Sequence, residues 1–400
     1  MPRTTPAPVA ATLVLLLAAG CAPAPAATGG EPGCASGYEA GRDYFPDKVS
    51  AQVSTQWQVS YRGSYKVLRV NAGPKTSLEQ TDTAPRTYVL PQCGTPAPEL
   101  TGELAGATVV PVPVRKAVDN PATLLGAFEL LAPEALAGYG EFPHKGTAPQ
   151  HLPGVAKRIK DGTAVQVGHG DKLDVEKVLT LGSQVMFADS GDKSRFDRLA
   201  AGGVPVVFYS PFNESPLGSA EQVKLLSLFT NTEAEANTHF DGVRTRYEQL
   251  RAKAAAAPKP SVLVGINGHG RDFLAPQNDY LEPTLVRDAG GATVFDLPGK
   301  ALQRLPMETM VERGATADFW FRPDFVGAGA TARSILAAEP RLSRITALTS
   351  GKGIDRADPR VYSAAGLANP DKLLADLVGV LHPDLLPGHR LEFLRRIEGG

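Results

Sequence analysis

Aromatic and basic residues stand where strand-like segments of the sequence run into loops. These residues are Tyr139, Phe142, Tyr209, Phe212, Tyr280, Trp320 and Arg322, together with His269 and Arg271 in the glycine-bearing segment 265–276. In parallel α/β sheets, ligands bind outside the carboxyl ends of the strands. Rings and guanidinium groups at such ends would suit a bulky, flat or anionic ligand. The alternative for each side chain is ordinary packing in the core or at its rim.

The sequence lacks the short patterns that mark common catalytic and nucleotide sites. Gly265, Gly268 and Gly270 follow a strand, but their spacing is not that of a dinucleotide-binding loop. Nucleophile-elbow, Walker, HExxH and EF-hand patterns are missing as well. We therefore expect no enzyme activity, no intrinsic cofactor and no metal held directly by the protein. A lipid-anchored α/β enzyme, the alternative of another class, would need a clustered nucleophile, base and acid.

Two glutamates occupy equivalent places in two similar segments. The segments are 175–187 (VEKVLTLGSQVMF) and 307–319 (METMVERGATADF). Each has a glutamate at its second position, a glycine six residues after the glutamate and a phenylalanine five residues after the glycine. Glu176 and Glu308 thus stand near the start of a short predicted helix, where a carboxylate gains from the helix dipole. Each could cap its helix, or the two together could dock on a basic partner.

Strand and helix patterns alternate along most of the chain, which indicates parallel sheets covered by helices. A hairpin is predicted within 53–70. Further strands are predicted at 87–90, 107–114, 136–142, 184–188, 205–209, 261–266 and 317–321, and helices at 123–131, 175–181, 195–201, 283–289, 306–313, 372–381 and 389–397.

A long helical stretch, 213–257, lies between the two halves of this alternation. Ser215-Pro216 and Ser219 are start signals for its first helix, with Ser219 as a capping-box hydroxyl, and Thr232 is expected to head a second capping box. We predict an N-terminal lobe at 38–231, a spine helix at 232–257 and a C-terminal lobe at 258–400. The fold class is α/β, with two lobes of parallel sheet on one connector.

The first residues of the sequence have the pattern of an export signal. A short apolar run ends in Ala18-Ala19-Gly20 before Cys21, similar to a lipobox whose cysteine is lipidated. An ordinary signal peptide cleaved elsewhere is the alternative. We expect a signal peptide at 1–20, a tether at 21–37, and an exported protein on a membrane surface, facing the periplasm or the exterior. An oxidising compartment permits a disulfide between Cys34 and Cys93, whose proximity the sequence does not show.

The overall composition is that of a globular protein. It is 42% hydrophobic and 21% charged, which excludes a disordered or fibrous chain. The formal net charge of −1 gives no general field for nucleic acid or an anionic membrane.

Four stretches carry a resemblance to a known family: 88–99 (YVLPQCGTPAPE), 107–140, 215–250 and 371–397. The chain resembles the lipid-anchored substrate-binding proteins of ABC importers, in the subgroup that carries iron–siderophore complexes, haem or cobalamin. The resemblance implies two Rossmann-like lobes, one long connecting helix and a ligand cleft that closes only slightly. It also implies that one glutamate per lobe docks on arginines of the permease dimer, and Glu176 and Glu308 match those positions.

The expected function is therefore that of a monomeric surface receptor. It would bind a ferric siderophore-type chelate between the lobes and deliver it to an ABC permease and its ATPase. Cobalamin or haem is the alternative cargo. A binding protein that serves as an adhesin or sensor is a further alternative.

Overall fold

The computed structural model describes residues 32–71, 85–120, 122–142, 148–188, 193–209, 211–267, 272–323 and 329–398. The predicted signal peptide, the lipidation residue Cys21 and most of the tether lie outside these residues. Two predicted ligand contacts, His269 and Arg271, also lie outside them.

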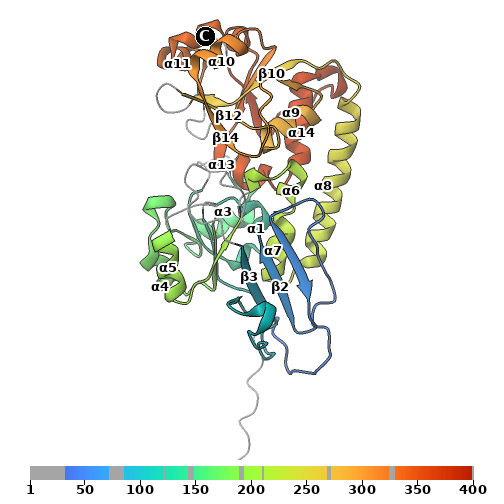
Figure 1. Ribbon diagram of the computed structural model, residues 1–400, viewed down its shortest axis with the longest axis vertical. Coiled ribbons are helices and arrows are strands. Elements are labelled where there is room, and N and C mark those ends of the chain that lie inside the picture. The colour runs from blue at the N-terminus through green and yellow to red at the C-terminus, as the bar shows by residue number, and fades with distance from the viewer. Residues whose placement is uncertain are drawn as a thin grey trace, which may run out of the picture.

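The N-terminal lobe is built on a five-stranded sheet in which every pairing is parallel, in the order β7-β6-β5-β8-β9. The strands are β5 Ala117–Asn120, β6 Leu136–Tyr139, β7 Val165–Gln166, β8 Val185–Ala188 and β9 Val206–Phe208. Helices α1 Leu125–Leu131, α2 Ala148–His151, α3 Pro153–Lys160, α4 Val175–Thr180 and α5 Lys193–Ala201 alternate with them. This alternation confirms the predicted parallel α/β lobe, which lies in the lower half of Figure 1.

The C-terminal lobe repeats this plan with the sheet order β13-β10-β15-β16-β17. Its strands are β10 Ser261–Val264, β13 Ala292–Thr293, β15 Phe319–Arg322, β16 Gly353–Arg356 and β17 Leu394–Arg396. Its helices are α9 Leu281–Asp288, α10 Met307–Gly314, α11 Ala332–Ala338, α12 Thr346–Thr349 and α14 Pro370–Leu381. The two similar sequence segments form the same pair of elements in both lobes, α4 before β8 and α10 before β15.

The helix predicted at 389–397 is wrong, because this segment contains β17, an antiparallel strand paired with β16. The buried carboxylate of Asp376 on α14 accepts hydrogen bonds from the backbone N–H groups of Phe393 and Leu394, at 2.7 and 2.9 Å. These bonds and the pairing with β16 hold the chain extended. A contact so distant in sequence overrides local helix propensity.

Two smaller sheets complete the strands. One has the order β1-β2-β3-β4, with β1 Trp57–Tyr61, β2 Tyr65–Val70, β3 Arg86–Pro91 and β4 Thr108–Val109; β1 and β2 form the predicted hairpin. The other has the order β11-β12-β14, with β11 Ile266–Asn267, β12 Asp272–Pro276 and β14 Leu302–Pro306. The strand predicted at 107–114 pairs regularly only at β4, because Pro111 and Pro113 lack the N–H group that a ladder needs.

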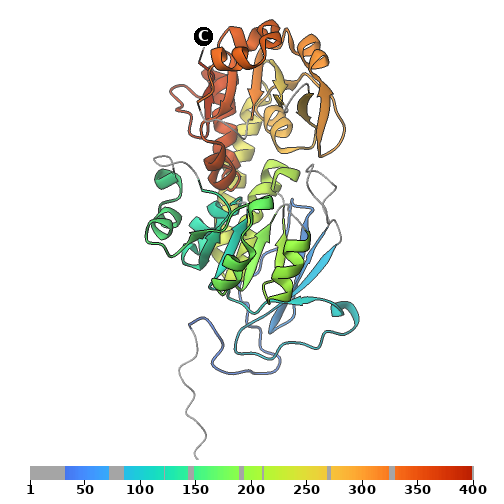
Figure 2. The same ribbon diagram turned by 90° about the vertical axis from the view of Figure 1, so that its left-hand side faces the viewer.

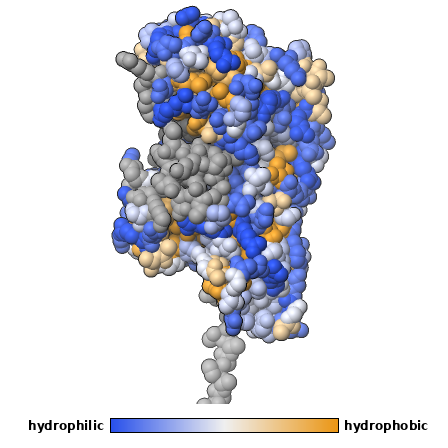
Figure 3. Space-filling view, viewed as in Figure 1, coloured by the Kyte–Doolittle hydropathy of each residue, from blue (hydrophilic) through white to orange (hydrophobic). Residues whose placement is uncertain are grey.

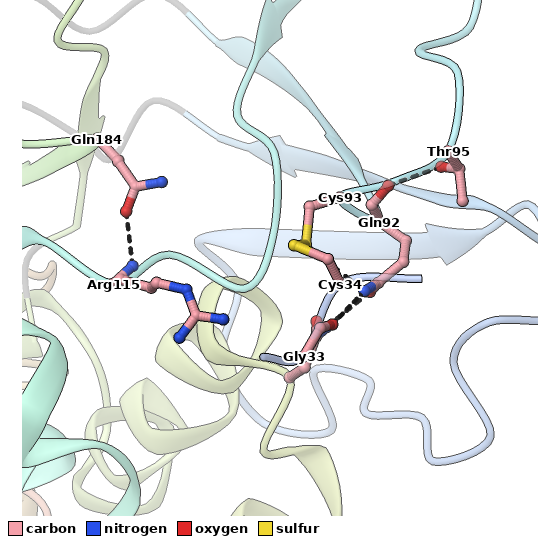
Figure 4. The surroundings of a disulfide bond; sticks show 8 residues. Gly33, Cys34, Gln92, Cys93, Thr95, Arg115 and Gln184 are labelled. Carbon is pink, nitrogen blue, oxygen red and sulfur yellow. Dashed lines mark hydrogen bonds between the residues drawn. A yellow bond between two sulfur atoms is a disulfide. The ribbon is translucent and has the colours of Figure 1, made fainter. Parts of the chain in front are cut away.

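A disulfide closes the start of the described chain onto β3. The structure joins Cys34 to Cys93, a pairing that the sequence left open. Figure 4 shows Gln92 beside this bond, with its amide nitrogen donating to the carbonyl oxygen of Gly33 at 2.6 Å. The amide nitrogen of Asn231, at the end of α7 Gln222–Thr230, donates to Gln92 Oε1 at 2.8 Å. The first described residues are thereby tied to the base of the connector.

The connector is α8, Glu233–Ala254, a single helix of 22 residues and about 33 Å that runs along both lobes (Figure 1). Two capping predictions near it are wrong. Ser215, not Ser219, caps α6 Pro216–Ala220, since its side chain accepts from the Gly218 N–H, while Ser219 is buried inside the helix. Thr232 stands at the start of α8 without a side-chain capping bond.

A returning segment of the C-terminal lobe also contacts the N-terminal lobe. It comprises α13 Pro359–Val361 and the π-helix η6 Tyr362–Gly366, which packs against α1, and it leads into α14, which packs against α8. Figure 2 shows this segment, in dark red, reaching down from the upper lobe to the lower one. One continuous core cluster contains Leu136, Phe240 and Ile354, from the first lobe, the spine and the second lobe. The two lobes are therefore packed on each other as well as bridged, while the predicted boundary residues stay a prediction.

Within the described residues, no helix combines the length and the apolar character that a membrane span requires. The face drawn in Figure 3 is mostly hydrophilic, and its apolar residues form separate patches.

Candidate functional site

The strand orders place a switch point in each lobe, where the chain turns from one half of the sheet to the other. In the N-terminal lobe it lies between β5 and β8, and in the C-terminal lobe between β10 and β15. Ligands of open α/β sheets bind at the carboxyl ends of the strands near such points. Here those ends are marked by Asn120 and Ala188 in one lobe and by Val264 and Arg322 in the other.

The carboxyl ends of the two sheets meet at the junction of the lobes. Phe212, just beyond β9, lies 5.7 Å from the guanidinium of Arg356, the last residue of β16. Glu141, just beyond β6, pairs with Arg360 of α13, just beyond β16, at 2.9 Å. Residues that follow the strand ends of both lobes thus lie together at the junction. We call this junction the inter-lobe site.

Arg356 is the centre of a buried group in this site. Its Nη2 donates to Oε1 of Glu282 at 2.7 Å, and both side chains are buried. Its guanidinium lies 4.2 Å from the centre of the Tyr362 ring. Burial raises the pKa of Tyr362 well above its ordinary value, so this hydroxyl stays protonated at neutral pH. The group combines a paired cation with aromatic faces, an arrangement suited to cation–π contacts.

A small pocket opens beside this group. It is lined by Gly265, Ile266, Tyr280, Glu282, Pro323 and Arg356, among others, and its volume is about 10 Å³. That is room for about one water molecule. This pocket is therefore too small for a chelate-sized ligand.

Tyr139 and Phe142 lie together at the end of β6. Their rings make an edge-to-face contact at 5.8 Å; Tyr139 is buried and Phe142 half-buried. Burial raises the pKa of the Tyr139 hydroxyl. Glu141, which makes the inter-lobe ion pair, lies between them in the chain.

Trp320 and Tyr209 do not lie on the cleft surface, and their placement there is corrected. Trp320 is fully buried in the C-terminal core, where its Nε1 donates to the carbonyl oxygen of Gly265 at 3.0 Å. It holds the backbone at the edge of the site without facing a ligand. Tyr209 is buried with its hydroxyl 3.4 Å from the carbonyl oxygens of Gly218 and Ser219, so it supports α6. Both side chains pack in the core, the alternative that the sequence left open.

Arg322 and Tyr280, the remaining described candidates, lie at the site but are buried by other side chains. Arg322 is buried and pairs with Asp355 at 3.3 Å, and Asp355 also pairs with Arg395 at 3.1 Å. Tyr280 is buried at the start of α9 and lines the small pocket. Their direct contact with ligand stays a prediction.

The sequence reasoning missed Arg356, Glu282, Tyr362, Glu141 and Arg360. The segment 353–361 (GIDRADPRV) held one usable signal, since Arg356 is followed closely by Asp358-Pro359, a helix start. Glu282 and Tyr362 gave no local signal, because their role depends on a partner far away in the sequence.

The two matching glutamates have matching surroundings. Glu176 and Glu308 lie in the first turn of α4 and α10, with side chains 76% and 73% exposed. Arg198 pairs with Glu176 at 2.8 Å and Arg341 pairs with Glu308 at 2.5 Å. Asp174 caps α4 by accepting from the Lys177 N–H, so Glu176 is not needed as a cap. Exposed carboxylates at equivalent places on the two lobes are available to a partner.

Among the described residues, no three histidine, cysteine or acidic side chains are grouped so that they could hold a metal ion.

Residues 139–356 match the periplasmic binding protein family, which is more than half of the chain. The chain belongs to this family. The family and its structural neighbours are solute-binding proteins of ABC transporters, which agrees with the prediction that the chain is not an enzyme.

Relatives of this family member include two uncharacterized lipoproteins of Methanocaldococcus jannaschii. MJ0878 is 26% identical over 245 residues, 60% of this chain and 58% of that protein. MJ0872 is 23% identical over 330 residues, 77% of this chain and 78% of that protein. The chain therefore spans less than two thirds of the length of the first relative.

Solved structures show the same fold. A periplasmic haem-binding protein from Pseudomonas aeruginosa superimposes with a TM-score of 0.57 at 19% identity, covering 72% of this chain and 99% of that one. An ABC transporter substrate-binding protein from Listeria monocytogenes gives a TM-score of 0.51 at 18% identity, covering 68% and 99%. These likenesses confirm the two-lobe α/β class.

Proposed function

We propose that this family member is a surface-anchored receptor that binds a ferric siderophore-type complex between its lobes and delivers it to an ABC permease. The observation that carries the proposal is the inter-lobe site itself. Strand ends of both lobes meet there; Arg356 lies beside the rings of Phe212 and Tyr362, and Arg360 pairs with Glu141. Cations beside apolar rings suit a bulky chelate with oxygen donors or carboxylates.

The spine and the returning segment support a carrier with a small motion. Because α8 runs along both lobes and η6 packs on α1, the distance between the two half-sites is nearly fixed. Small openings are then enough for loading, in contrast to a wide hinge.

The partner side of the proposal rests on Glu176 and Glu308. One exposed carboxylate per lobe provides two docking points for arginines on a permease dimer, which an ATPase would drive. Cys21 would carry the lipid that holds a monomeric receptor at the membrane surface.

Isothermal titration of the purified chain against ferric siderophores, haem and cobalamin tests the ligand. We expect saturable one-to-one binding of at least one ferric siderophore and weaker binding of the other two. Tighter binding of haem or cobalamin would reassign the cargo and keep the receptor role. Failure to bind any of them would contradict the proposal and favour a sensor or adhesin.

A further inference from the structure

The ion pair between Glu141 and Arg360 joins the two lobes at the edge of the site. Arg360 Nε donates to Glu141 Oε2 at 2.9 Å, across 219 residues of sequence. Glu141 lies in the chain between Tyr139 and Phe142, whose rings contact each other. The two side chains are 38% and 43% exposed, so a solute reaches them without unfolding the protein.

Arg360 is held in place independently of this pair. The side chain of Asp358 caps α13 by accepting from the backbone N–H groups of Arg360 and Val361, at 2.8 and 3.2 Å. The backbone of Arg360 therefore keeps its position when Glu141 is removed. Its guanidinium would then face the junction with unused donors.

The pair is not needed to hold the lobes together. The Ser219 hydroxyl donates to the Leu367 carbonyl oxygen at 3.3 Å in a buried contact, and His239 Nε2 lies 3.0 Å from the Ala368 carbonyl oxygen. An exposed ion pair adds little stability, because water screens the attraction and two long side chains lose freedom. A pair that contributes little to packing is readily exchanged for a competing anion.

We propose that Arg360 selects anionic chelates and that Glu141 is its internal competitor. A carboxylate or other oxyanion on the chelate would replace Glu141 on the guanidinium, whose planar donors match two oxygens at once. A neutral chelate gains nothing from this exchange. This inference rests on the proposed function and assigns its substrate class.

Pairs of ligands that share one scaffold but differ in charge provide the test. The probes are haem against its dimethyl ester, and N-succinyl against N-acetyl ferrioxamine B; in each pair only the first member carries a free carboxylate. Titration calorimetry gives the ratio of the Kd values of the neutral and the anionic member for each protein variant. In the unmodified chain we expect this ratio to favour the anionic member.

Two substitutions should move this ratio in opposite directions. Glu141→Gln removes the competitor and should raise the preference for the anionic probe about two- to five-fold, the range that a screened charge contact supplies. Arg360→Gln should lower that preference by a similar or larger factor. The Kd of the neutral probe should stay within about two-fold in both variants.

Glu103→Gln is the matched control, because Glu103 is also a half-exposed acid paired with arginines, Arg62 and Arg69, but lies in the chain between β3 and β4 of the small N-terminal sheet. It should leave the ratio unchanged. Equal shifts in this control, or unchanged ratios in both cleft variants, would overturn the role of Arg360 while the receptor function stands. Exclusive binding of the neutral probes or of cobalamin would also overturn it. Failure to bind any probe would overturn the proposed function and this inference together.

Discussion

Gly126 of α1 and Ala364 of η6 bring the backbones of the two lobes into direct contact. A Cβ atom at Gly126 would lie 2.2 Å from the Ala364 carbonyl oxygen, a distance that no real side chain occupies. The close approach therefore requires glycine at this place. It fixes the returning segment against the N-terminal lobe and limits how far the lobes separate.

Substituting Gly126 should loosen this contact. We expect Gly126→Ala to lower the free energy of unfolding by about 1–3 kcal/mol, because overpacking displaces backbone that cannot give way. Denaturant unfolding measures the loss, and small-angle scattering should show a larger radius of gyration. Gly242→Ala in α8 is the control, since a Cβ there meets only the flexible end of Arg246. That variant should be neutral or up to about 1 kcal/mol more stable. Equal destabilisation by both substitutions would contradict the special role of Gly126.

Lys66 should make stability rise with pH in the alkaline range. Its ammonium is buried against Glu233, and burial lowers its pKa to about 8. In the unfolded chain the lysine pKa is near 10.5, so between pH 8 and 10.5 the unfolded chain holds a proton that the folded chain has released. The contribution of Lys66 to the unfolding free energy therefore increases as the pH rises through that window. Urea unfolding at pH 7.5, 8.5 and 9.5 measures it.

Lys66→Met is the control for this pH dependence. The slope assigned to Lys66 should disappear, while the slope from Lys224, whose pKa burial also lowers, should persist. The variant should also lose about 3–5 kcal/mol, because Glu233 is left buried without its cation. Lys66 also donates to the Leu228 carbonyl and Asn231 side-chain oxygens, so part of the loss comes from those bonds. An unchanged slope in the variant would refute the assignment.

Reduction of the disulfide should destabilise the N-terminal sheet. Cys34 and Cys93 close a loop across a separation of 59 residues, for which cross-linking typically contributes about 2–4 kcal/mol. The double variant Cys34→Ser/Cys93→Ser should melt at a lower temperature than the oxidised chain. Adding reductant should bring the unmodified chain down to that temperature and leave the variant unchanged. A melting temperature that does not respond to reductant would show that the bond contributes nothing measurable.

Reversing the charges of Glu176 and Glu308, the proposed docking residues, should stop the proposed transport without affecting ligand binding. The double variant Glu176→Arg/Glu308→Arg places cations where the permease is proposed to present arginines, so cellular uptake of the bound chelate should fall at least tenfold. The calorimetric Kd should remain within about two-fold. Glu248→Arg, a reversal at an exposed position of the spine helix, is the control and should transport normally. Loss of ligand affinity in the double variant would instead place these glutamates in the binding site.

The sequence by itself determined the α/β class, the alternation of elements and the long connector. These features follow from hydrophobic periodicity and from proline and glycine positions, which are local properties of the chain. The helix α8 and the matching positions of Glu176 and Glu308 could be predicted from the sequence for the same reason.

Only the tertiary structure decided which side chains form the site. Trp320 and Tyr209 end in the core, whereas Arg356 meets Glu282 across 74 residues and Arg360 meets Glu141 across 219. The strand β17 likewise exists because β16 and Asp376 hold it extended. Whether a ring faces a ligand or the core, and whether a charge finds a partner, depends on packing between distant segments, and a local pattern carries no information on that packing.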